Sequence, residues 1–125
     1  MSFKDELRLK ANQYHETQRL IEKHRVEAFE RENKKFIDMG LKTQDQIDVF
    51  HKMSSEISEA AKTGHYRTTI YFKDFVAVNS LSDDYQFNIL YDAFIITKNY
   101  FKSNGLNVLV PKEAEMRDMW FEFSW

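Results

Sequence analysis

The sequence predicts an α+β fold, in which an N-terminal hairpin of long helices precedes a small antiparallel sheet of three or four strands packed on one central helix. The expected order of elements is α-α-β-α-β-β. One proline and three glycines in 125 residues favour long, uninterrupted elements. Apolar residues recur at three- and four-residue spacing between Ser82 and Gly105, and they alternate after Gly64 and again in the last seven residues.

The segment from Ser82 to Gly105 is the expected central helix. Ser82 is a suitable N-cap, and Asn104 with Gly105 can adopt the left-handed backbone that closes a helix. One side of this helix is bulky and apolar, so it should be buried. That side consists of Phe87, Leu90, Tyr91, Phe94, Ile95 and Phe101.

Residues 3 to 38 contain no glycine or proline and many charged side chains, which predicts one long helix ending near Gly40. Apolar residues recur every seven positions, but Gln18, Arg25 and Glu32 interrupt the stripe. A helix this polar can bury only a small part of its surface within one subunit, and we therefore expect it to hold subunits together. The alternative is a solvated helix without a partner. The expected interface consists of Leu7, Ala11, Tyr14, Ile21 and Ala28.

Thr43 followed by Gln46 resembles a capping box and predicts a second helix that runs to about Lys62 and closes at Gly64. The short connection between the first two helices favours an antiparallel hairpin. We therefore expect two domains, a helical hairpin for oligomerisation in residues 1–64 and a small α+β unit in residues 65–125.

Strands are predicted where apolar residues alternate with polar ones. From Tyr66 to Lys73 the inward face would carry Tyr66, Thr68, Ile70 and Phe72. Two further strands should pair as a hairpin: residues 106–110, which Pro111 terminates, and residues 119–125. Residues 75–78 fit either a short strand or a covering loop.

Charge and composition exclude several classes of protein. The 18 basic and 20 acidic residues nearly balance, which argues against duplex DNA binding through bulk charge and against a DNA mimic. The chain has no cysteine, so it has no disulfide or thiolate metal site, and a cytoplasmic location is expected. No signal-peptide pattern and no apolar run of membrane-spanning length is present.

Motifs for catalysis, metals and cofactors are lacking in the sequence. No two histidines are three or four residues apart, no serine lies in a GxSxG elbow, and the isolated glycines form no phosphate loop. We therefore expect a protein without metal or cofactor and without enzymatic activity. The histidines are His15, His24, His51 and His65.

The outward row of the first strand is the candidate ligand site, because hydrogen-bond donors, a ring and two positive charges suit a nucleotide. The alternative is that the helical hairpin or a second subunit covers this face. The candidate residues are Arg67, Thr69, Tyr71 and Lys73, with Trp120 contributed by a neighbouring strand.

Three stretches, GHYRTTIYF, KSNGLNVLV and MWFEFSW, together resemble the layout of small accessory proteins of tailed phages. The resemblance implies a small oligomeric protein, without enzymatic activity, that acts in the bacterial cytoplasm by binding a host protein, such as a defence factor. It equally allows a sponge for nucleotide second messengers, with its pocket at a subunit boundary. No site residue carries over.

Overall fold

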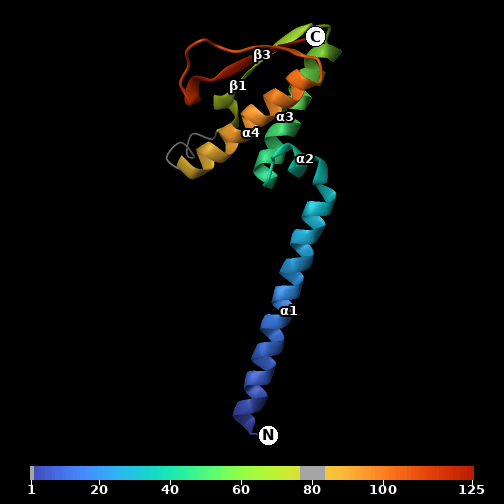
Figure 1. Cartoon of the computed structure of the whole chain (residues 1–125), viewed down its shortest axis with the longest axis vertical. Coiled ribbons are helices and arrows are strands. Elements are labelled where there is room, and N and C mark those ends of the chain that lie inside the picture. Colours follow the sequence, from blue (N-terminus) through green and yellow to red (C-terminus); the bar gives the residue numbers. More distant parts are fainter. Residues whose placement is uncertain (1, 77–83) are drawn as a thin grey trace. The chain divides into compact units, whose positions relative to one another are not determined.

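The computed structural model describes residues 2–76 and 84–125, and it confirms the α+β class and the expected order of helices and strands (Figure 1). In these described residues, the 3-10 turns η1 and η3 lie between the main elements. In chain order the elements are α1 (Phe3–Glu32), α2 (Lys34–Met39), α3 (Gln44–Lys62), β1 (Arg67–Tyr71), η1 (Phe72–Phe75), α4 (Asp84–Ser103), β2 (Asn107–Leu109), η3 (Met116–Asp118) and β3 (Trp120–Ser124).

The chain divides into two compact units after Ile37, whereas the sequence predicted a division after Gly64. The reason is the packing of α3, which contacts both α4 and β1. Its apolar side chains Ile47, Phe50 and Met53 are buried within residues 38–125. The second helix therefore belongs with the sheet, and the expected domain boundary is corrected.

The first unit consists mainly of α1, which has no buried residue. Ser2 caps its start, because the hydroxyl accepts a hydrogen bond from the backbone N–H of Asp5 at 3.2 Å. The helix ends at Asn33, whose side-chain amide donates to the carbonyl of Phe29 at 2.9 Å. The backbone N–H of Asn33 donates to the same carbonyl at 3.0 Å, and the single helix predicted to Asp38 is divided at this residue into α1 and α2.

The sheet of the second unit has three antiparallel strands among the described residues, in the order β1-β3-β2. Tyr71 lies opposite Trp120, and Val108 lies opposite Phe123. The hairpin of the last two strands is therefore confirmed. β1 is shorter than predicted, because the chain turns into η1 after Tyr71.

Helices α3 and α4 pack on one face of this sheet (Figure 1). The predicted alternation is confirmed within β3 and at Ile70 and Phe72, which are buried. It is wrong at Tyr66, which lies before β1 and is 77% exposed. Rings from both layers form the core, and Phe50 of α3 stacks on Phe101 of α4 with centroids 5.8 Å apart. The buried side chains on the sheet are Ile70, Phe121 and Phe123, and Phe72 at the start of η1 is buried as well.

The end of α4 is as predicted. Gly105 has a φ of 98°, and the N–H of Leu106 donates to the carbonyl of Phe101 at 3.1 Å. This is a Schellman closure, which requires the left-handed backbone that glycine adopts without strain. The predicted cap Ser82 lies outside the described residues, as do residues 77 and 78 of the segment that fitted a strand or a loop.

Candidate functional site

The candidate ligand row lies on the outer face of the sheet. Tyr71 is the register partner of Trp120, and Thr69 is the register partner of Glu122. Helices α3 and α4 pack on the opposite face of the sheet.

Both predicted positive charges have a neighbour on this face. The Arg67 guanidinium lies 3.8 Å from the Glu122 carboxylate, a distance at the limit of an ion pair. Lys73 belongs to η1 rather than to the strand, and its ammonium lies 5.2 Å from the centre of the Tyr71 ring. The structure therefore brings the five predicted residues to one face. The carboxylate of Glu122 lies among them, and its negative charge would repel a phosphate group.

Apolar side chains add to this outer face. The side chain of Leu109 is 57% exposed, and it lies on β2 opposite Glu122. It was not among the residues predicted for this face, because the pattern in residues 106–110 was used only to predict a strand. The face thus combines rings, an aliphatic side chain and mixed charges, a composition found in protein–protein interfaces.

A second candidate surface is the apolar stripe of α1. At 100° per residue, Phe3, Leu7, Tyr14 and Ile21 fall within an arc of about 40°, and all four are exposed. Of the other two predicted interface residues, Ala11 is exposed and Ala28 is half-buried. Phe3 extends the predicted stripe by one more turn.

A groove of about 520 Å³ lies between the C-terminal half of α3 and β1. Sequence analysis missed it, because nothing in the pattern placed α3 beside this strand. Burial raises the pKa of the Glu56 carboxyl above its ordinary value; Lys52 opposes the rise and Asp74 adds to it. The lining residues are Glu56, Glu59, Ala60, Thr63, His65, Arg67, Thr68, Thr69, Tyr71 and Asp74.

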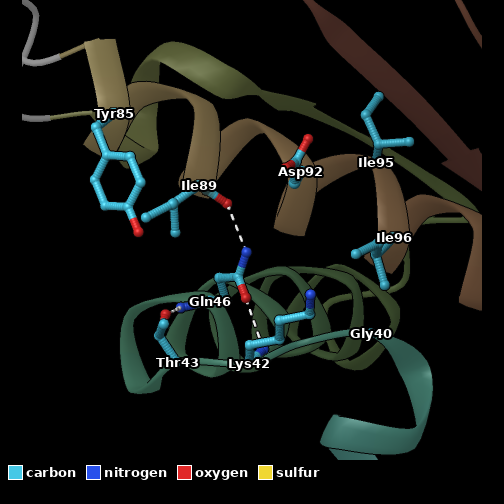
Figure 2. Close-up of a pocket in the computed structure, with 9 residues that line it drawn as sticks. All are labelled: Gly40, Lys42, Thr43, Gln46, Tyr85, Ile89, Asp92, Ile95 and Ile96. Carbon is cyan, nitrogen blue, oxygen red and sulfur yellow. Dashed lines mark hydrogen bonds between the residues drawn. The ribbon is translucent and has the colours of Figure 1, made fainter.

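A pocket of about 440 Å³ lies between the start of α3 and α4 (Figure 2). Its buried polar side chain is Gln46, which accepts from the N–H of Lys42 at 2.7 Å and donates to the carbonyl of Ile89 at 3.0 Å. The hydroxyl of Thr43 caps α3, as predicted. Gln46 and Thr43 therefore make structural hydrogen bonds, and those of Gln46 join the start of α3 to α4.

Two further searches bear on function. Among residues 2–76 and 84–125, no three histidine, cysteine or acidic side chains are grouped so as to hold a metal ion. No helix in the described part of the chain has the length and apolarity needed to cross a membrane.

Comparison with protein-family models, with curated proteins and with solved structures finds no match to this chain.

Proposed function

We propose that this chain is a binding protein without enzymatic activity, which self-associates through α1 and engages a partner protein with the outer face of its sheet. The observation that carries the proposal is a helix of 30 residues without a buried side chain. Isolated helices are marginal in water and normally gain stability by packing an apolar stripe. The stripe of Phe3, Leu7, Tyr14 and Ile21 supplies such a surface.

The occupant of that stripe is a second copy of α1. The seven-residue spacing of Leu7, Tyr14 and Ile21 is the repeat that keeps two helices in contact along a seam. Gln18 and Arg25 lie in the same stripe, and polar residues at such positions restrict the register and the number of helices. Burying each large apolar side chain fully contributes about 1.5 to 3 kcal/mol, and these side chains are already partly covered.

The outer face of the sheet fits a protein better than a nucleotide. Tyr71 and Trp120 would stack on a base, and Lys73 would contact a phosphate. However, the carboxylate of Glu122 lies on the same face and engages Arg67. The resemblance to phage accessory proteins supports a host protein in the bacterial cytoplasm, such as a defence factor, as the partner.

The solution mass tests self-association. Ile21 and Leu20 are adjacent, similar in size and nearly equally exposed, at 48% and 44%, but Leu20 lies about 100° away from Ile21 around α1 and so outside the stripe. We expect Ile21→Glu to reduce the mass to that of a monomer, whereas Leu20→Glu keeps the mass of the wild type. Equal masses for the two variants would contradict a seam along this stripe.

Thermal melting separates the two kinds of partner. A ligand present at 100 times its dissociation constant stabilises a protein by about 2.7 kcal/mol. We expect cyclic nucleotides and ADP-ribose derivatives to leave the melting temperature unchanged. A rise that disappears in Trp120→Ala would instead support the nucleotide sponge.

A further inference from the structure

Among residues 2–76 and 84–125, β1 is an edge strand, because the order of the sheet is β1-β3-β2. The N–H of Phe72 donates to the carbonyl of Met119 at 2.9 Å, and the N–H of Trp125 donates to the carbonyl of Tyr66 at 3.1 Å. In an antiparallel pair the backbone groups of successive residues point alternately toward the partner strand and away from it. The even-numbered residues therefore direct their backbone groups toward β3.

The odd-numbered residues Arg67, Thr69 and Tyr71 direct their backbone N–H and C=O groups toward the open edge. In the part of the chain that the structure describes, these groups have no hydrogen-bond partner. Unpaired groups in a row are a template for a further strand. The β1 segment RTTIY contains no proline, which would block such pairing.

Helix α3 runs along this edge and supplies an acidic wall. Glu56 and Glu59 line the groove from α3, and Asp74 lines it from η1. The one arginine of the lining, Arg67, is engaged on the outer face by Glu122. The groove therefore has one polar backbone side and one negatively charged side.

We propose that this groove binds an extended, basic segment of another protein as a fourth, antiparallel strand beside β1. Backbone hydrogen bonds to Arg67, Thr69 and Tyr71 supply the affinity, as in other cases of strand addition. Side chains of the added strand alternate between the two faces. Every second residue therefore faces Glu56 and Glu59, and lysine or arginine at those positions complements the wall.

A second copy of this chain is a poor occupant of the same groove. Antiparallel pairing of two β1 edges about Thr69 would place both α3 helices on the same face of the joined sheet. Glu56 and Glu59 of each copy would then approach the same residues of the other, and opposed like charges are destabilising. The interaction uses the strand edge and does not require α1 to self-associate.

Peptide titration of the full chain tests the backbone pairing. The probe is a fluorescent peptide of about seven residues in which lysine alternates with threonine. In antiparallel addition, directly opposed residues share a face, so the threonine N–H groups point toward β1 and the lysine N–H groups point away. We expect saturable binding below about 1 mM, lost on N-methylation of the threonines and kept on N-methylation of the lysines. No saturable binding, or binding that survives threonine N-methylation, would overturn the proposal.

Two variants test the residues of the groove. Thr69→Pro removes an N–H that makes no ladder bond, so the fold is kept while binding weakens about tenfold or more. Replacing both Glu56 and Glu59 by Gln should weaken binding to a similar extent and reduce its dependence on salt. The matched control replaces Glu113 and Glu115 by Gln in the exposed connection before η3. If the control weakened peptide binding as much as the Glu56 and Glu59 replacements, the acidic wall would have no role in binding. This comparison does not depend on whether Thr69→Pro folds.

Discussion

Phe94 of α4 and Phe121 of β3 stack with ring centroids 4.6 Å apart and planes 22° apart, and both side chains are fully buried. This pair joins the central helix to the central strand. Phe72 of η1 also contacts Phe94, with centroids 5.4 Å apart. The helix layer and the sheet layer therefore share one aromatic cluster.

Truncating this contact should destabilise the second unit strongly. Phe94→Ala removes a buried ring and leaves a cavity, at an expected cost of about 3 to 5 kcal/mol in the free energy of unfolding. Chemical denaturation monitored by tryptophan fluorescence measures the loss. Tyr85 lies on the same helix but is exposed, so Tyr85→Ala should cost much less. Equal losses would mean that α4 does not pack as described.

The buried side-chain amide of Gln46 should also contribute to the stability of the fold. Gln46→Ala leaves the carbonyl of Ile89 and the N–H of Lys42 without their partner, which should lower stability by about 1 to 3 kcal/mol. Gln44→Ala serves as the control, because Gln44 also bonds a neighbour, Asp48, but at the exposed surface. Thermal melting of the two variants measures the difference, and similar melting temperatures would contradict the bridging role of Gln46.

The shifted carboxyl of Glu56 predicts a dependence on pH. Its pKa is raised in the folded state, mainly by burial, so folding favours the protonated form. Wild-type stability therefore falls as pH rises through the raised pKa, and Glu56→Gln avoids that loss. We expect the variant to melt above the wild type at pH 7, with the difference vanishing below the ordinary pKa of 4.5. Glu113→Gln controls for the loss of one charge.

Gly105, which has a left-handed backbone at the end of α4, should lose stability on substitution for conformational reasons alone. A Cβ atom added at Gly105 would meet nothing within 4 Å, so Gly105→Ala suffers no steric clash. The positive φ should still cost about 1 to 2 kcal/mol. Asparagine tolerates this region better, so Gly105→Asn should unfold at a denaturant concentration between those of Gly105→Ala and the wild type. Indistinguishable midpoints for the three proteins would count against the closure.

Patterns of burial were readable from the sequence, whereas the identity of packing partners was not. Alternation placed Ile70 and Phe121 inside correctly, because side chains on a pleated strand alternate by necessity. The stripe of α3 was also recognised, but a stripe does not say what covers it. Its true neighbours, α4 and β1, follow from tertiary packing, and so the domain boundary moved to Ile37.

The groove and the helix break were missed for related reasons. Glu56 and Glu59 look like ordinary solvated acids until α3 is set beside the edge of β1. Asn33 lies in a charged stretch without glycine or proline, so no residue that usually ends a helix marks the end of α1. The outer face was anticipated, since its residues follow from the same alternation that places the core.

Both β1 and β2 pair with β3 and not with each other. Neither strand therefore has a hydrogen-bonding neighbour until residues 120–124 have left the ribosome, although the helices emerge earlier. Residues 67 and 124 pair although they are far apart in the sequence, and contacts of such large sequence separation form slowly. A nascent chain that stalls before Trp120 would hold two unpaired strands, so the synthesis of β3 is the event that commits this sheet to its native form.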